Sequence, residues 1–189
     1  YDVWAYLLIL KVLVVYNRAT GDDRVEEPIR RALKCLDWHV DGHTLFGWAQ
    51  TRWYEGLVAV FWLYERTGEE WLLQLASKLR GSGFDWKEFF GENWPYKTVS
   101  EKTHWGQFNH VVNNAMMLKG AVMYSRINGD ETDKGFGEKA FETLMQYHGM
   151  ATGVFSGDEC LDGDSPFQGT ELCAVAELMY SFEHIFAVT

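Results

Sequence analysis

The sequence is short of the residues that mark several classes of protein. It holds 3 prolines and 3 cysteines among 189 residues. The cysteines, Cys35, Cys160 and Cys173, cannot form a disulfide framework, because an odd count leaves at least one thiol free or bound to a metal. So few prolines leave long helices uninterrupted. Disulfide-rich and proline-rich architectures are therefore excluded.

Positive charge and long apolar runs are also scarce. The chain has 17 Lys and Arg against 27 Asp and Glu, a net charge of −10. Nucleic acids and anionic membrane surfaces are bound by basic patches, so we expect neither as a partner. The most apolar segment, residues 3–16, carries Lys11 and is amphipathic, so we expect no membrane-spanning helix. The chain begins at Tyr1 without a signal-peptide pattern, so we expect a mature or partial product whose compartment stays open.

Apolar residues with a helical period are abundant. Hydrophobic residues make up 47% of the chain, which is enough for one domain with a substantial core. A period of 3.6 residues predicts helices over 3–16, 24–38, 53–64, 70–80, 111–126, 139–147 and 174–186. We therefore predict a single all-α domain over residues 1–189. Cys35, within the second of these helices, is interpreted as a small buried apolar residue.

Three of the predicted helices end in the same kind of segment, Tyr16–Asp22, Tyr64–Glu69 and Tyr124–Asp130. Each holds an aromatic residue, then a glycine able to take the left-handed conformation after a helix, then an acid that can begin or cap the next helix. Repeated helical hairpins form either an open solenoid or a closed α/α toroid. The aromatic residues and acids of the loops favour the toroid, whose cavity would suit a sugar.

The segment from 155 to 173 carries the strongest chemical signal. It combines acids, glycines and two cysteines, and it leads directly into the last predicted helix. Glu171 and Cys173 lie two residues apart at this junction and have side chains that could share a cation. Glu159 is a candidate acid in the same segment. The alternative for Glu171 is an acid of the first helical turn that favours the helix dipole.

His110 lies at the start of the predicted helix over 111–126, between Asn109 and Asn113. One interpretation is a ligand for sugar hydroxyls, since a helix N-terminus favours the neutral imidazole. The alternative is a capping cluster, in which Asn109 caps the helix and His110 packs.

Aromatic and polar residues near loops are further candidates. His104, Trp105 and Gln107 precede His110 in the sequence and could share its site. Trp53 and Trp105 lie in or beside loops, where an indole can stack on a sugar ring. Ordinary packing is the alternative for both, because tryptophan is highly buried on average.

Three segments resemble glycoside hydrolase family 127, the β-L-arabinofuranosidase group. Residues 171–180 are similar to the Glu-x-Cys-Ala motif that opens a helix in that family. Residues 53–76 resemble its helix ending in Leu-Tyr-Glu-x-Thr-Gly-Asp and the Leu-x-Leu-Ala helix that follows. Residues 109–119 resemble a third family helix, which opens with a substrate-facing histidine. The resemblance implies an α/α toroid of the six-hairpin type.

The resemblance also implies a retaining hydrolysis of non-reducing-end L-arabinofuranosides or related sugars. In the family a zinc ion is held by one Glu and three Cys, and a zinc-bound thiolate is the nucleophile. Glu171 and Cys173 would be two of the zinc ligands, and Glu159 would be the general acid/base. The residues expected to contact the carbohydrate are His110, Trp53, Trp105 and Asn113.

The chain departs from the family pattern in several places. It has no adjacent pair of cysteines, which the family uses as the other two zinc ligands, so the zinc site is incomplete. Glu159 and Glu171 are closer in sequence than the family leads us to expect, and Trp53 stands where a histidine is expected. A six-hairpin toroid needs about twelve helices, and roughly seven fit here. We therefore expect a fragment that is inactive by itself and self-associates through exposed apolar faces.

Two other functions stay open from the sequence. One is a non-catalytic scaffold of helical hairpins that binds a peptide or an oligosaccharide. The other is a different carbohydrate enzyme of the α/α-toroid type, such as a lyase or an unsaturated-glucuronyl hydrolase, which works without zinc. A gene that continues to an adjacent cysteine pair would favour the arabinofuranosidase-like hydrolase over the scaffold. Metal content would separate that hydrolase from the zinc-independent toroid enzymes.

Overall fold

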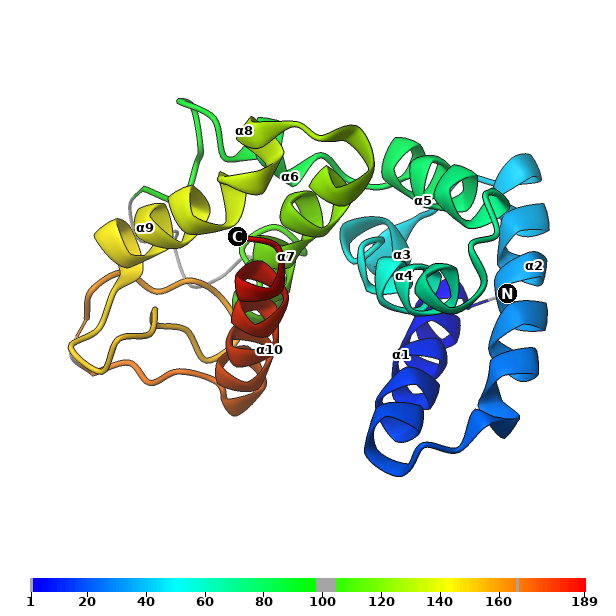
Figure 1. Ribbon diagram of the computed structural model, residues 1–189. Helices are drawn as coiled ribbons and strands as arrows, with labels where there is room; N and C mark the ends of the chain where they lie inside the picture. The colour runs from blue at the N-terminus through cyan, green and yellow to red at the C-terminus, as the bar shows by residue number, and fades with distance from the viewer. Residues whose placement is uncertain (1, 98–104, 166) are drawn as a thin grey trace. The chain divides into compact units, whose positions relative to one another are not determined.

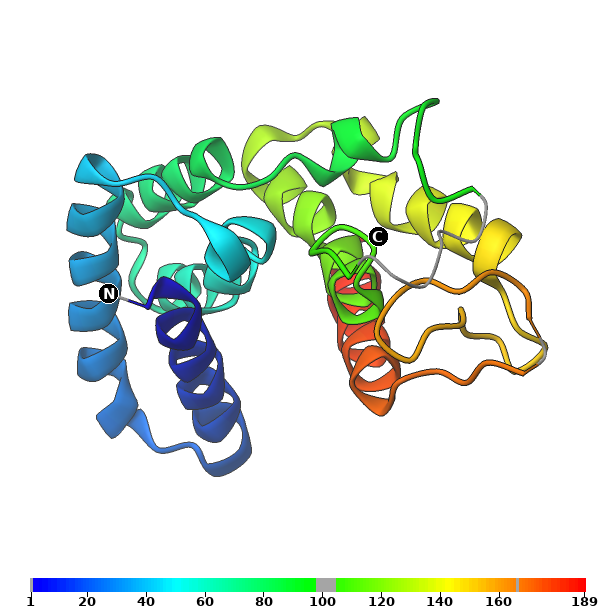
Figure 2. The same cartoon turned by 180° about the vertical axis from the view of Figure 1, so that it is seen from behind.

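The computed structural model describes residues 2–97, 105–165 and 167–189 (Figures 1 and 2). The regular structure of these residues is helical, and they include no strand, which confirms the predicted all-α class. The chain forms two compact units, unit 1 over 1–84 and unit 2 over 85–189. The single domain over 1–189 stays a prediction.

Unit 1 is built around one buried helix. Its elements are α1 (Val3–Thr20), the 3-10 helix η1 (Asp23–Val25), α2 (Glu26–Gly42), α3 (Gly47–Thr51), α4 (Glu55–Thr67) and α5 (Trp71–Ser82). Helix α4 contacts α1, α2 and α5, and every residue from Glu55 to Leu63 is buried. The fully buried Glu55 carboxylate pairs with Lys11 Nζ of α1 at 3.0 Å. A buried carboxylate is retained here because its charge is compensated.

Unit 2 has the same organisation around a different helix. Its elements are α6 (Trp86–Phe89), α7 (Val111–Asn128), α8 (Glu131–Lys134), α9 (Phe136–His148) and α10 (Leu172–Val188). Helix α7 is buried along most of its length, and α10 and α9 pack against it. Figures 1 and 2 both show α10 beside α7, and Ser181 Oγ of α10 donates to the Ala115 carbonyl of α7 at 2.8 Å.

The helices that periodicity predicts are all present, with ends that differ by a few residues. The three predicted glycine terminators are confirmed: Gly21, Gly68 and Gly129 follow α1, α4 and α7 with φ values of 69°, 68° and 64°. Asp22 and Asp130 then cap the helices that come next, as expected. The expectation was wrong for Glu69, because α5 begins at Trp71 with Glu70 as its N-cap and no side-chain cap bond. The hairpin joints are thus set by local residues.

The prediction for Cys35 was wrong, because the residue is exposed. The buried positions of α2 are Ile29, Leu33 and Leu36, spaced along one helical face. Cys35 is one position, or about 100°, away from Leu36 around the helix, which turns its thiol away from the core.

Helix α1 is long and apolar enough to cross a membrane by length and composition. Core helices and signal sequences pass the same test, and 28% of its apolar window is buried within the structure. Whether the protein meets a membrane is not decided by this helix, and the expectation of no membrane partner stays a prediction.

Candidate functional site

Segments that are distant in the sequence meet at the first turn of α7. Residues 109–111 run beside residues 159–161, where His110 and Cys160 form an isolated antiparallel bridge. Two backbone hydrogen bonds flank this bridge, from the Val111 amide to the Glu159 carbonyl (2.8 Å) and from the Leu161 amide to the Asn109 carbonyl (2.9 Å). The backbone thereby fixes Glu159 next to His110.

A second junction brings the start of α10 to the same place. The Gly157 amide donates to the Gly169 carbonyl, and the Glu171 amide donates to the Gly157 carbonyl, both at 2.9 Å. Gly157 has a φ of 153°, and a Cβ there would lie 2.5 Å from the Cys160 carbonyl oxygen. Only glycine therefore lets the segments that carry Glu159 and Glu171 approach this closely.

His110 is the N-cap of α7, and its side chain is nearly buried. Its Nδ1 accepts a hydrogen bond from the Asn113 amide at 3.3 Å, and the residue is 7% exposed. The alternative in which Asn109 caps this helix was wrong: Asn109 Oδ1 accepts instead from the Gly106 amide at 2.9 Å. His110 thus combines the two roles: its side chain caps α7, and its ring also borders the site.

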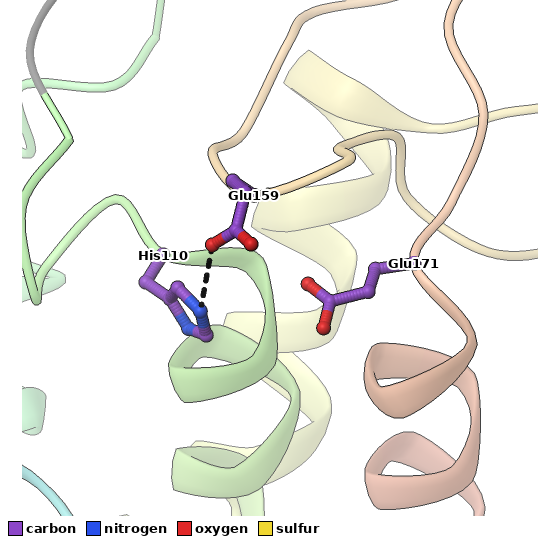
Figure 3. Close-up of side chains that lie close together, drawn as sticks. All are labelled: His110, Glu159 and Glu171. Carbon is purple, nitrogen blue, oxygen red and sulfur yellow. Dashed lines mark ion pairs between the residues drawn. The ribbon is translucent and has the colours of Figure 1, made fainter.

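The carboxylates of Glu159 and Glu171 converge on His110 (Figure 3). His110 Nε2 lies 3.4 Å from Glu159 Oε2, and one ligand atom from each of the three residues lies within 4.8 Å of the others. The Glu159 side chain is 67% exposed. Glu171 differs, because its Oε2 is buried and accepts no hydrogen bond from any residue that the structure describes. A buried carboxylate oxygen without a donor is costly, so this atom calls for a cation or a hydroxyl group.

Trp105 borders the cluster on the solvent side. Its indole lies edge-on to the His110 ring, with centroids 5.9 Å apart and an interplanar angle of 76°. The residue is 51% exposed. An exposed indole against the histidine that neighbours Glu159 is a surface on which a sugar ring can stack.

Two thiols lie near the carboxylates and neither is activated. A hydrogen bond with Glu171 raises the pKa of the exposed Cys173 thiol, and the charge of Glu171 adds to this effect. Burial raises the pKa of Cys160, and the neighbouring Glu159 and Asp162 act in the same direction. Both side chains are therefore neutral thiols at neutral pH, and neither is a nucleophile by itself.

The residues fit a zinc ion only in part. The unsatisfied Glu171 oxygen and the adjoining Cys173 thiol suit two positions of a zinc site. The other two ligands that the resemblance implies are an adjacent cysteine pair, which the sequence does not contain. Within the described residues, the His110, Glu159 and Glu171 cluster includes no cysteine. The chain thus offers half of the implied donor set.

Other predicted contact residues take structural positions. Asn113 is fully buried, and its Nδ2 donates to the Gln107 carbonyl at 2.7 Å, which ties the preceding loop to α7. Trp53 belongs to unit 1, is 3% exposed, and donates from Nε1 to the Phe84 carbonyl at 3.2 Å. His104 lies outside the described residues. Of the predicted contacts, His110 lies next to the Glu159 carboxylate, and Trp105 packs against the His110 ring.

Sequence reasoning missed the part that His148 plays in holding the acid-bearing loop. The imidazole is fully buried, its Nδ1 accepts from the Gly163 amide at 2.8 Å, and its Nε2 donates to the Tyr96 carbonyl at 2.7 Å. It therefore joins the end of α9 to two loops. The sequence signals only a histidine at a helix C-terminus, because both partners are distant along the chain.

The comparisons with known proteins add no assignment to this geometry. No protein-family model, curated protein or solved structure matches the chain.

Proposed function

We propose that this chain is part of a glycoside hydrolase that acts on non-reducing-end L-arabinofuranosides or related sugars with retention of configuration. The observation that carries the proposal is the pair formed by Glu159 and Glu171, one carboxylate open to solvent and the other with a buried unsatisfied oxygen. The two environments suit two different parts, because an exposed carboxyl group can exchange protons with a substrate and a buried carboxylate oxygen needs a cation or a donor.

Retention of configuration enters the proposal from the resemblance alone. Carboxylate oxygens of Glu159 and Glu171 lie within 4.8 Å of each other. The carboxyl separation that distinguishes retaining from inverting enzymes is measured between the acid/base and its nucleophilic or basic partner. Glu171 is a zinc ligand in this proposal, so its distance from Glu159 does not decide between the two outcomes.

Glu159 is the acid/base in this proposal. Its exposed carboxyl group can reach a glycosidic oxygen, protonate it as the bond breaks, and later take the proton from the attacking water. Trp105 offers the surface on which the sugar ring stacks. The nucleophile is not assigned to a residue of this chain, because the adjacent cysteine pair that completes the zinc-thiolate site in the resembled family is absent from the sequence.

Glu171 and Cys173 are the residues that would hold a zinc ion. When bound, zinc supplies a positive charge that keeps a coordinated thiol deprotonated at neutral pH. The buried Oε2 of Glu171, which accepts no hydrogen bond from the described residues, supports its assignment to the ion.

The α/α toroid is part of the same proposal. It is supported by hairpins of similar construction in both units, each with a buried helix that is ended by a left-handed glycine, namely α4 with Gly68 and α7 with Gly129. A toroid brings such buried helices together around one cavity, and loops at the end of that cavity carry the chemistry.

The test is hydrolysis of 4-nitrophenyl β-L-arabinofuranoside by the product of the full gene, with zinc measured by elemental analysis. We expect turnover, about one zinc per chain, loss of turnover in Glu159→Gln, and loss of zinc in Cys173→Ser. Binding of L-arabinose that survives Glu159→Gln, without hydrolysis of any glycoside by the unaltered protein, would identify a carbohydrate-binding scaffold instead. Turnover without zinc would place the chain with the metal-free α/α-toroid enzymes.

A further inference from the structure

We propose that His110 is a positioning residue for Glu159 and not a metal ligand, because capping of α7 fixes its ring as the Nε2–H tautomer. The inference rests on the proposed function, since it assigns His110 a part in the work of the acid/base. It concerns the same cluster of His110, Glu159 and Glu171 whose spacing would also admit a cation.

The tautomer follows from one hydrogen bond. A neutral imidazole has one ring nitrogen that accepts and one that donates. Nδ1 of His110 accepts from the Asn113 amide at 3.3 Å, so its lone pair is committed to the helix. The proton therefore sits on Nε2, the atom that lies 3.4 Å from Glu159 Oε2. An ion at Nε2 would have to displace this proton or break the helix cap.

Both ends of the contact are held by backbone. The Asn114 side chain donates to the His110 carbonyl at 2.9 Å, and the His110 amide donates to the Gly106 carbonyl at 3.1 Å. On the other side, the Glu159 carbonyl accepts from the Val111 amide at 2.8 Å. The backbone segments that carry the ring and the carboxylate thus cannot separate without opening the first turn of α7.

This arrangement distinguishes the two oxygens of Glu159. A side chain that is 67% exposed would otherwise rotate freely, and ordering it costs conformational entropy. Nε2 of His110 lies 3.4 Å from Oε2 (Figure 3), and with the proton on Nε2 the attraction between the two favours one orientation of the carboxylate. Oε1 is then the oxygen left to carry the proton that the acid/base delivers. Such positioning is worth most where the geometry of proton transfer is strict.

The first experiment reads the tautomer without any substrate. The purified chain is labelled with 15N-histidine, long-range 1H–15N spectra are recorded at pH 7.5, and the His110 signals are assigned by their loss in His110→Asn. We expect an unprotonated Nδ1 and a protonated Nε2, and we expect Glu159→Gln to shift the Nε2–H signal. A protonated Nδ1, or an Nε2–H signal that ignores Glu159→Gln, would overturn the proposal.

The same spectra test the metal alternative. Zinc chloride is added in equimolar amount, and the His110 signals are compared with those of His43, whose ring is exposed. We expect His110 Nε2 to keep its proton. Loss of that proton with a large shift of the Nε2 signal on adding zinc would make His110 a ligand and would reject the positioning role.

Conservative and disruptive variants separate positioning from folding. Asparagine is a strong N-cap residue, so His110→Asn keeps the cap of α7 and loses the contact with Glu159. His110→Leu loses both. With the full gene product, we expect His110→Asn to keep the thermal midpoint, to lower kcat and to leave KM little changed, whereas His110→Leu lowers the midpoint as well.

An unchanged kcat in a folded His110→Asn would contradict the positioning role. If the unaltered protein hydrolyses no arabinofuranoside, the proposed function fails by itself. The tautomer and the response to Glu159→Gln would still decide whether His110 orients this carboxylate.

Discussion

At the scale of single residues, Glu171 controls the reactivity of Cys173. The thiol is exposed, yet its hydrogen bond with Glu171 raises its pKa, so the thiolate is scarce at neutral pH. We predict slow alkylation of Cys173 by iodoacetamide at pH 7.5, and faster alkylation in Glu171→Gln, because the amide carries no charge. Peptide mass spectrometry over time measures the rate at each cysteine.

Cys35 is the internal control for that measurement. It is exposed on α2, and it belongs to unit 1, so its alkylation rate should be the same in both proteins. A Cys173 rate that Glu171→Gln leaves unchanged would show that the carboxylate does not hold the thiol.

His148 makes the stability of unit 2 depend on pH. Burial lowers its pKa below the ordinary value of 6.5, so the folded state binds fewer protons than the unfolded state below that pH. The stabilisation is complete above about pH 6.5 and is lost as the pH falls toward the lower pKa of the folded state. We predict a falling free energy of unfolding over this window, measured by urea denaturation.

Substitution of His148 separates this effect from other titrations. His148→Gln should cost about 1–3 kcal/mol at pH 7.5, since the Gly163 amide and the Tyr96 carbonyl lose well-placed partners. It should also flatten the pH dependence below 6.5. His43→Gln, at an exposed position of unit 1, is the control for the substitution itself and should leave the stability at pH 7.5 unchanged. A full pH dependence in His148→Gln would assign it to other groups.

At the scale of elements, the helices were predictable and the junctions between distant segments were not. Periodicity finds each helix because a buried face repeats along a continuous segment, as in α2 with Ile29, Leu33 and Leu36. The spacing of these three residues would also have indicated that Cys35 lies off the buried face. The glycine terminators were predictable as well, because the left-handed conformation is a local requirement.

The site was predictable in its residue types and not in its geometry. The spacing of Glu171 and Cys173 pointed to a shared ion, and the structure places the two side chains in contact. Nothing local indicates that residues 109–111 run beside 159–161, because that junction is made by backbone bonds between distant segments. The tautomer of His110 follows instead from a local contact, the hydrogen bond that its Nδ1 accepts from the Asn113 amide.

Substitution of Gly157 tests the junction between these distant segments. Gly157→Ala places a methyl group against the Cys160 carbonyl and 3.0 Å from the Val111 side chain, at a φ of 153°. We predict a loss of about 3 kcal/mol or more in the free energy of unfolding, as strain and collision add. Gly153→Ala is the control, since it shares a positive φ of 85° but meets no atom within 4 Å.

The two alanine variants should also differ at the carboxylates. Gly157→Ala should alter the His110 ring signals in 15N spectra, because it separates the segments that hold Glu159 and Glu171. Gly153→Ala should leave those signals in place and cost roughly 1 kcal/mol. Equal losses of stability in the two variants would mean that positive φ alone, and not the close approach, constrains the loop.

At the scale of the whole molecule, each unit leaves one apolar helix face uncovered by described residues. On α1 these residues are spaced along one side: Leu8, Ile9, Val12, Val15 and Tyr16, which are 41–59% exposed. On α10 the most exposed apolar residues recur at every seventh position: Leu172, Met179 and Phe186, which are 68–79% exposed. Contiguous apolar surface of this kind is uncommon on a monomer and marks places of association.

We therefore predict that the chain of 189 residues self-associates, with a sedimentation coefficient that rises with concentration. Ile9→Lys with Val12→Glu on α1, and Met179→Lys with Phe186→Glu on α10, each place opposite charges on a face, so neither pair changes the net charge. Each pair should weaken association, because charged side chains are costly to bury without partners. Sedimentation velocity over a hundredfold concentration range is the measurement.

The comparison of the two pairs identifies the surface that matters. If one pair alone abolishes association, that face is the contact; if each reduces it in part, both faces take part. Leu72 and Leu144 are buried in units 1 and 2, so substituting them should unfold the chain, and such variants cannot serve as controls.

The control is the charge swap Lys139→Glu with Glu142→Lys on α9. It keeps the net charge and alters no apolar face, so it should leave the sedimentation coefficient unchanged. A sedimentation coefficient independent of concentration in the unaltered chain would contradict the prediction. The apolar faces of α1 and α10 would then remain exposed to solvent without causing association.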